Sequence, residues 1–334
     1  MRLIVQIPCL NEAETIVPVI TEVLEATRDF EDALILVIDD GSSDGTAEIA
    51  LKAGAHLVAR HRRNQGLARA FMTGISVALN HGADVIVNTD GDNQYRAADI
   101  PKLIAPVAEG RADIVVGARA IEEIAHFSPF KKRLQRLGTW VVRLLSGTEV
   151  ADATSGFRAL SREAGLRMKT MSNSTYTLET LIQAGRSGLV VDSVDIRVNP
   201  PTRPSRLIRS IAQYVRRSAI DMLRVYTIYA PLRSYVMVGA VPIAGAVALG
   251  FRYLYLVNFV DPTRSHAPSL ILAAILTGAG LFLWGLGVIG ELLSVNRRLL
   301  EDIRSARVRA AAAEGSLAGP VTYDLLRADR DTPA

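Results

Sequence analysis

Cysteine is almost absent from this chain: Cys9 is the only one among 334 residues. A single cysteine cannot form a disulfide within the chain, which excludes a small disulfide-held fold and fits a reducing compartment. Histidine is also rare, with five residues. Cysteine and histidine do not cluster in the sequence, so no zinc site is predicted. We expect Cys9, which follows Pro8 at the end of an apolar run, to be a packed structural thiol.

Three further signals are missing. The apolar run near the N-terminus, Leu3–Ile7, is too short for the core of a secretory signal peptide, so we expect the N-terminal domain to stay in the cytosol. The chain has no internal repeat, its formal net charge is only +4, and it carries no recognisable nucleic-acid-binding motif. We therefore predict that nucleic acid is not a partner.

Short apolar runs alternate with helical patterns in the first part of the chain. Strands are predicted near residues 3–7, 34–38, 56–59, 85–87, 114–116, 156–161 and 189–198. Helices are predicted at 11–27, where Asn11 would be the cap, and at 44–53, 65–79, 162–168 and 177–186. This alternation predicts an α/β domain over residues 1–204, with a Rossmann-like, mostly parallel sheet covered on both faces.

Three polar turns follow predicted strands, at residues 8–12, 39–44 and 90–94. Ligands of parallel sheets bind at the carboxyl ends of the strands, so we expect the three turns to meet at one edge. The third turn has Asp90, Asp92 and Gln94 at alternate positions. Such oxygen ligands suit Mg²⁺ or Mn²⁺ bound to a diphosphate. A solvated acidic turn is the alternative for this motif alone, and the neighbouring turns favour the metal.

Two long apolar segments lie in the C-terminal third, at about residues 236–260 and 270–293. Each reaches the ~20 residues that cross ~30 Å of hydrocarbon. We predict a two-span transmembrane hairpin over residues 234–294, with buried core helices as the alternative. Small residues in the first segment suit close helix packing and suggest a homo-oligomer: Ala240, Ala244 and Ala248.

Arginines flank these segments unevenly. Seven lie between residues 203 and 233 and five between 297 and 309, whereas the link between the segments has only Arg264. The positive-inside rule places both chain termini in the cytosol. Residues 205–233 form a basic amphipathic pattern, which predicts an interfacial helix on an anionic lipid surface rather than an ordinary surface helix. Residues 295–334 are predicted to be a basic cytosolic tail, to which the sequence assigns no function.

Four motifs occur in a familiar order and spacing. They are Pro8-Cys9-Leu10-Asn11-Glu12-Ala13-Glu14, Ile38-Asp39-Asp40-Gly41-Ser42-Ser43-Asp44-Gly45-Thr46, Asn64-Gln65-Gly66-Leu67 and Asp90-Gly91-Asp92-Asn93-Gln94. The chain resembles the family-2 glycosyltransferases of the GT-A fold. Thr154-Ser155-Gly156-Phe157-Arg158-Ala159 and the C-terminal hairpin narrow the resemblance to polyprenyl-phosphate (dolichyl-phosphate type) sugar synthases, over most of residues 3–300. The family usually has prolines after the fourth motif, where Tyr95 and Arg96 stand here.

The resemblance implies a role for each motif. Nucleotide contact falls to Pro8, Leu10, Glu12, Asp39, Asp40 and Asp90. Catalysis and the binding of Mg²⁺ or Mn²⁺ fall to Asp90 and Asp92, with Gln94 as a further metal ligand. Contact with the acceptor phosphate falls to Arg119, Arg133, Arg158 and Arg203. Asp152 is expected to orient Arg158, and Tyr176 and Glu179 either shape a pocket or pack a helix face.

The implied reaction is the inverting transfer of one sugar from a nucleotide-sugar to a polyprenyl phosphate. A lipid phosphate is already ionised at neutral pH, so it needs no general base and only a cationic cradle. The resemblance favours a UDP-sugar over a GDP-sugar, although no residue identifies the sugar. It implies a multi-pass protein of the plasma (inner) membrane with a cytosolic catalytic domain.

Three alternatives are open. A processive polysaccharide synthase would need a Q-x-x-R-W motif near the interfacial helix, and Gln135–Trp140 has the wrong spacing and comes too early. A catalytically silent membrane scaffold would not need the intact acidic motif. A sugar nucleotidyltransferase would need a glycine-rich N-terminal signature, which is missing.

Overall fold

The computed structural model describes residues 1–119, 129–170, 176–200, 216, 219–220, 223–224, 226–260 and 267–328. The chain forms two compact units. The first comprises residues 1–222 and 304–334, and the second comprises residues 223–303. The predicted domain boundary at residue 204, the first part of the predicted interfacial helix and Arg203 lie outside the described residues.

An eight-stranded mixed sheet forms the centre of the first unit, in the order β7-β5-β6-β4-β1-β2-β3-β8. The strands are β1 (Leu3–Cys9), β2 (Ala33–Asp39), β3 (Leu57–His61), β4 (Val85–Asn88), β5 (Ile114–Arg119), β6 (Arg158–Ser161), β7 (Val191–Ile196) and β8 (Tyr323–Arg327). Strands β1 to β4 are parallel, as are β5 and β7, whereas β6 and β8 run antiparallel to their neighbours. The predicted α/β fold with a mostly parallel sheet is confirmed.

Helices of the first unit are α1 (Ile16–Ala26), α2 (Thr46–Lys52), α3 (Leu67–Asn80), α4 (Ile100–Ala108), α5 (Pro129–Ser146), α6 (Arg162–Arg167) and α7 (Thr177–Arg186), with a 3₁₀ turn at Ala97–Asp99. All seven residues of β1 are buried, as expected for a strand covered on both faces. The predicted helix start at Asn11 is wrong. Asn11 has a left-handed backbone with φ 54°, and α1 begins five residues later.

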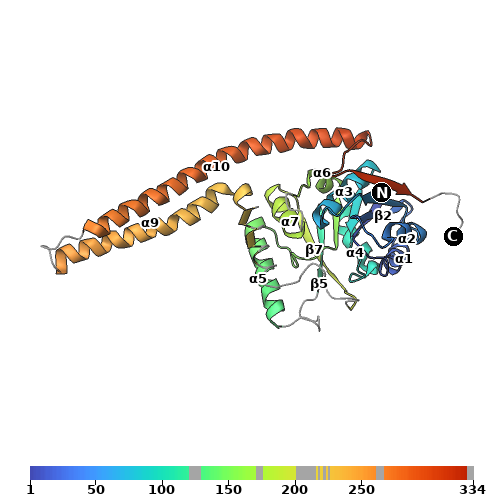
Figure 1. Cartoon of the computed structure of the whole chain (residues 1–334), viewed down its shortest axis with the longest axis horizontal. Helices are drawn as coiled ribbons and strands as arrows, with labels where there is room; N and C mark the ends of the chain where they lie inside the picture. The colour runs from blue at the N-terminus through green and yellow to red at the C-terminus, as the bar shows by residue number, and fades with distance from the viewer. Residues whose placement is uncertain are drawn as a thin grey trace. The chain divides into compact units, whose positions relative to one another are not determined.

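The C-terminal tail contains a strand that the sequence pattern did not reveal. Strand β8 pairs antiparallel with β3, from Leu57 opposite Arg327 to His61 opposite Tyr323, and lies beside the N-terminal strands in Figure 1. Upstream of β8, the Asn80 side chain donates to the Leu317 carbonyl and accepts from the Leu317 amide, both at 2.8 Å. The tail is therefore part of the folded α/β unit.

The second unit is a pair of long apolar helices that run side by side (Figure 1). Helix α9 (Pro231–Tyr255) continues as a π-helix through Val260, and α10 (Ala267–Ala313) extends beyond the unit. Residues 231–260 and 267–297 are long and apolar enough to cross a membrane, and only 11% of the most apolar window of each is buried. Such low burial argues against the alternative of core helices.

Close packing within this pair occurs at two glycines. A Cβ on Gly239 would lie 3.0 Å from the Gly280 carbonyl oxygen, and the reverse distance is also 3.0 Å. Small residues at helix contacts of this kind allow backbones to approach in membranes. Ala240, Ala244 and Ala248 are exposed on α9, and the homo-oligomer that they suggest stays a prediction.

Candidate active site

The three polar turns meet at the carboxyl edge of the sheet, as predicted. Cys9 at the end of β1 pairs in register with Asp39 at the end of β2, and the Asp40 amide donates to the Cys9 carbonyl at 2.9 Å. On the other side of β1, the Thr89 amide donates to the Gln6 carbonyl at 3.1 Å. Parallel pairing thus places the carboxylates of the second and third turns on either side of the first turn.

The first turn supports its two neighbours. The Asn11 side chain accepts from the Ser43 amide at 2.9 Å, which ties it to the second turn. The Thr15 hydroxyl lies 2.8 Å from both the Glu12 carboxylate and the Gly91 carbonyl, and these contacts connect the first turn to the third turn. Cys9 is buried, and burial raises the pKa of its thiol well above the ordinary value, as expected of a structural cysteine.

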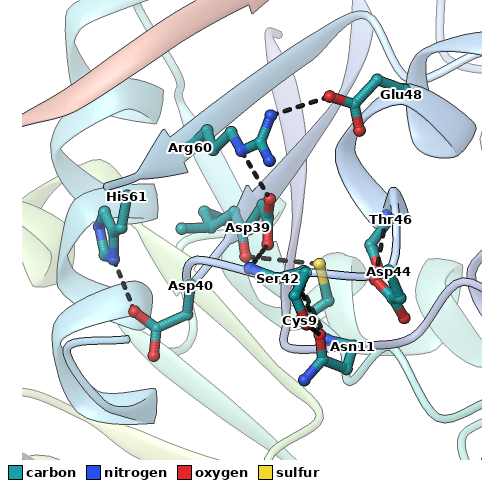
Figure 2. A network of polar contacts seen from close by, with 12 residues as sticks. Cys9, Asn11, Asp39, Asp40, Ser42, Asp44, Thr46, Glu48, Arg60 and His61 are labelled. Atoms are coloured by element: carbon teal, nitrogen blue, oxygen red, sulfur yellow. Dashed lines mark hydrogen bonds and ion pairs between the residues drawn. The ribbon is translucent and has the colours of Figure 1, made fainter. Parts of the chain in front are cut away.

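Asp39 and Asp40 have different surroundings, although both were predicted to contact a nucleotide. The Asp40 carboxylate contacts the His61 ring at 2.7 Å (Figure 2). It also accepts from the backbone amides of Gln65 and Gly66, each at 2.8 Å. Its oxygens therefore stabilise the loop before α3, and contact between Asp40 and a nucleotide stays a prediction.

One carboxylate oxygen of Asp39 has no hydrogen-bond partner among the described residues. Its side chain is fully buried and one oxygen, Oδ1, accepts from the Ser42 amide at 2.8 Å. The other, Oδ2, lies 3.4 Å from Arg60 Nε and has no hydrogen-bond partner among the described residues. Buried polar atoms are almost always paired in folded proteins, so this acceptor is suited to an N–H group of a bound molecule.

The acidic turn brings two carboxylates together without compensating them fully. Asp92 accepts from the backbone amide of Gln94 at 3.2 Å and from its side-chain amide at 2.8 Å. Burial and the charge of Asp92 raise the pKa of Asp90 to about 7, while Arg119 and Arg158 act in the opposite direction. A cation would relieve this repulsion.

Oxygen atoms of Asp90, Asp92 and Gln94 are the donor types that Mg²⁺ and Mn²⁺ prefer. No group of three or more His, Cys, Asp or Glu side chains able to hold a metal is found among the described residues. The donor set therefore fits a divalent cation whose remaining ligands come from a bound molecule, such as a diphosphate.

A buried polar network, not predicted from the sequence, fixes Gly156 against Asp90. The Asn88 side-chain amide donates to the Gly156 carbonyl and to the Tyr176 hydroxyl, both at 2.8 Å. The Gly156 amide donates to the Tyr95 hydroxyl at 3.0 Å. A Cβ on Gly156 would lie 3.1 Å from each Asp90 carboxylate oxygen, so the loop backbone forms one wall of the acidic turn.

Tyr95 and Arg96, which replace the expected prolines, brace the same turn. Tyr95 forms an isolated antiparallel bridge with Val198. The Arg96 guanidinium donates to the side-chain oxygen of Asn199 at 3.1 Å, and the backbone amide of Asn199 donates to the backbone carbonyl of Gln94 at 2.8 Å. The turn after the acidic motif is therefore held by the segment that follows β7.

The four arginines predicted to bind the acceptor phosphate are not equivalent. Arg119 is mostly buried and donates two hydrogen bonds, of 2.6 and 3.2 Å, to Asp152. Asp152 was expected to orient Arg158, but it orients Arg119 instead. Arg133 is exposed on α5. The Thr154 hydroxyl accepts from both Arg119 and Gln135 at 2.7 Å, which links the end of β5 to α5.

Arg158 does not fit a direct contact with an acceptor. Its side chain is only 2% exposed. Its three nitrogens donate to the Ser155 carbonyl, the Ala153 carbonyl and the Thr180 hydroxyl at 2.8 to 3.0 Å. Arg158 instead holds the loop that carries Gly156, and its charge acts on Asp90 through the protein.

Comparisons with known proteins agree with this geometry. The model of the family described as Glycosyl transferase family 2 matches residues 4–165. Glycosyltransferase AglJ of Haloferax volcanii is 31% identical over 307 residues, which cover 89% of this chain and 95% of that protein. The UDP-N-acetylglucosamine–dolichyl-phosphate N-acetylglucosaminyltransferase of Methanococcus voltae is 30% identical over 57% of this chain and 83% of its own length.

A solved structure shares the fold. Glucosyl-3-phosphoglycerate synthase from Mycobacterium tuberculosis, crystallised with Mn²⁺, UDP-glucose and phosphoglyceric acid, has a TM-score of 0.53 at 21% identity. The match covers 67% of this chain and 79% of that chain.

Proposed function

The chain belongs to glycosyl transferase family 2 and has the GT-A fold, and we propose that it transfers one sugar from a nucleoside-diphosphate sugar to a polyprenyl phosphate. The observation that carries the proposal is the position of Asp90. The charge of Asp92 raises the pKa of Asp90, and the charges of Arg119 and Arg158 lower it. We infer that this carboxylate lies between the donor diphosphate, near Asp92, and the acceptor phosphate, near Arg119.

The donor would bind along the carboxyl edge of the sheet. The base would lie against Pro8 and Leu10, and Asp39 would accept a hydrogen bond from it. Asp90, Asp92 and Gln94 would hold the divalent cation, Mg²⁺ or Mn²⁺, which neutralises the diphosphate as it leaves. The relative from Methanococcus voltae is named for UDP-N-acetylglucosamine and dolichyl phosphate, which supports a UDP-sugar donor and a polyprenyl phosphate acceptor here.

The transfer needs no proton movement by the protein. An oxygen of the acceptor phosphate attacks the anomeric carbon from the face opposite the nucleotide, and the bond between that carbon and the diphosphate oxygen breaks. The diphosphate leaves with the electron pair of that bond, and the configuration inverts because the attack comes from the opposite face. Arg119, fixed by Asp152, would orient the acceptor phosphate together with Arg133, and holding the reactants in line lowers the entropic part of the barrier.

Two features of the described structure support an acceptor within a bilayer. The helices α9 and α10 are long and apolar enough to span a membrane. Helix α5 has no acidic residue and exposes Leu137, Trp140 and Leu144, at 55%, 59% and 64%, beside basic residues such as Arg133. Aromatic and basic side chains together suit the interface between lipid headgroups and water.

The test is a transfer assay with membranes that contain the protein, a set of labelled nucleotide-sugars and a polyprenyl phosphate. We expect one donor to give an organic-soluble product, labile in mild acid, that carries one sugar. The Asp92→Ala variant should lose transfer while it stays folded and membrane-bound. Asp195→Asn, at an exposed carboxylate on β7, is the matched control and should keep full activity.

Other outcomes of the same assay would overturn the proposal. A long water-soluble polymer would indicate a processive synthase. No transfer from any donor would indicate a silent scaffold. Transfer that survives Asp92→Ala would remove the acidic turn from the mechanism.

A further inference from the structure

Arg60 is a residue of the donor site that the sequence motifs do not include. It lies on β3, where its Nε is 3.4 Å from Asp39 Oδ2 and its Nη1 is 2.8 Å from Glu48 Oε1. Figure 2 shows its guanidinium between the two carboxylates. Asp39 is completely buried, whereas 37% of the Arg60 side chain and 55% of the Glu48 side chain are exposed. A buried carboxylate is costly unless a cation balances it, and Arg60 provides that balance.

The ion pair between Arg60 and Asp39 does not use all the oxygen lone pairs of Asp39. The Arg60 contact is an ion pair too long for a hydrogen bond, and Oδ2 has no hydrogen-bond partner among the described residues. Arg60 therefore holds the charge in place without occupying the acceptor. Oδ2 is itself buried, so its lone pairs have no hydrogen-bond donor among the described residues unless a ligand N–H enters this site.

Strand β8 fixes Arg60 from the other side. Arg60 pairs in register with Asp39 of β2 and with Asp324 of β8, so β8 turns β3 from an edge strand into an interior one. The tail that carries β8 is anchored independently by Asn80 and by an ion pair of 2.5 Å between Arg309 and Glu163. Backbone pairing on both sides restricts where the Arg60 side chain can reach.

We infer that Arg60 is a positioning residue for the nucleoside end of the donor and that β8 holds it there. Together they present Asp39 as a fixed anionic acceptor for a ring N–H of the base. Uracil N3 and guanine N1 carry that hydrogen, whereas cytosine N3 and adenine N1 present a lone pair that the carboxylate repels. The inference rests on the proposed function, since Asp39 must face the base. A site built to accept a hydrogen bond can reject an analogue that lacks the donor by ~10⁴-fold.

Calorimetric titration of the full-length protein in detergent with Mn²⁺ tests the role of Arg60. The probes are UDP, GDP, CDP and uridine. We expect Arg60→Gln to weaken the binding of the preferred nucleotide, UDP or GDP, about tenfold, as for one charge-assisted contact, and to reduce its preference over CDP. If UDP is preferred, uridine should lose the same factor, because the change concerns the base. Arg60→Lys, which restores a cation, should recover most of the affinity.

The strand is tested with Leu325→Pro, which interrupts β8, and with Leu325→Val as the control that keeps the backbone N–H. The proline variant should show the same loss of base preference as Arg60→Gln, with an unchanged KM for the acceptor. The inference is overturned if Arg60→Gln binds every nucleotide as the wild type does, or loses the preferred nucleotide and CDP equally. If Leu325→Pro lowers the melting temperature but leaves the base preference unchanged, β8 does not hold Arg60 in position and that part of the inference is overturned. A protein that binds neither UDP nor GDP would instead contradict the proposed donor class.

Discussion

Gly156→Ala should damage the acidic turn although it adds only a methyl group. The new Cβ would lie 3.1 Å from both Asp90 carboxylate oxygens and 3.0 Å from the Tyr176 hydroxyl, which is tighter than ordinary van der Waals contact. Tyr176 cannot give way easily, because its ring stacks on Phe71 at 4.0 Å and its hydroxyl is bonded to Asn88. The Asp90 carboxylate must therefore move by a few tenths of an ångström.

The expected loss follows from that displacement. Misplacing a reacting group by ~1 Å costs ~10²-fold in rate, so a shift of a few tenths of an ångström should lower kcat/KM for sugar transfer by about three- to tenfold. Overpacking of this kind costs ~1–3 kcal/mol of stability. The assay is initial-rate transfer with the donor identified by the screen, over a range of Mn²⁺ concentrations, and weaker activation by Mn²⁺ is the specific signature.

Gly138→Ala is the matched control. Gly138 lies in α5, and no described residue comes within 4 Å of its added Cβ, so alanine there should raise helix stability by ~1 kcal/mol and leave activity unchanged. Wild-type kcat/KM and Mn²⁺ activation in Gly156→Ala would refute the reasoning, because they would mean that Asp90 need not occupy the observed position.

Three further predictions concern the rest of the site. Arg158→Gln should lower the melting temperature, since the buried carbonyls of Ser155 and Ala153 lose a charged hydrogen-bond donor. Arg133→Gln should only raise the KM for the acceptor phosphate. The reverse pattern in thermal unfolding and kinetics would contradict both assignments. Because the pKa of Asp90 is raised to about 7, its carboxylate gains a proton as pH falls below that value. The affinity for Mn²⁺ should therefore drop by up to ~tenfold per pH unit, which Mn²⁺ titrations between pH 5 and 8 would measure. An affinity that does not change with pH would exclude Asp90 as a ligand. Trp140 is one of two tryptophans, and in a Trp284→Phe background its fluorescence should be quenched by brominated lipids in anionic vesicles; no quenching would show that this face of α5 does not meet lipid.

The donor side of the site could be predicted because it depends on local pattern. Apolar runs that end in polar turns are enough to place Asp39 and Asp90 at one edge once the strands are parallel. Arg60 could not be found in this way. It is the fourth of the five residues of β3 and reaches Asp39 only through the register between β2 and β3, which no pattern within either strand specifies.

The acceptor side was harder to predict because it depends on burial. Arg119 and Arg158 are both arginines near the acidic turn, yet a single carboxylate, Asp152, pairs with Arg119, and backbone carbonyls satisfy Arg158. Helix α5 was not predicted at all. Strand β8 was also missed, since a short strand far along the chain is recognisable only when its partner, β3, is known.

The charges around Asp90 determine what the site can bind without help. Asp92 and Glu12 raise the pKa of Asp90, whereas Arg119 and Arg158 lower it, and Arg119 is itself paired with Asp152. A diphosphate brought into this field meets repulsion, whereas a nucleoside does not. Removing divalent cations with EDTA should therefore weaken UDP binding at least tenfold. Uridine binding should stay unchanged in the same calorimeter, since uridine has no diphosphate and would depend on Asp39 rather than on the cation. Equal affinity for UDP with and without the chelator would mean that fixed protein charges, and not a cation at Asp90 and Asp92, hold the diphosphate.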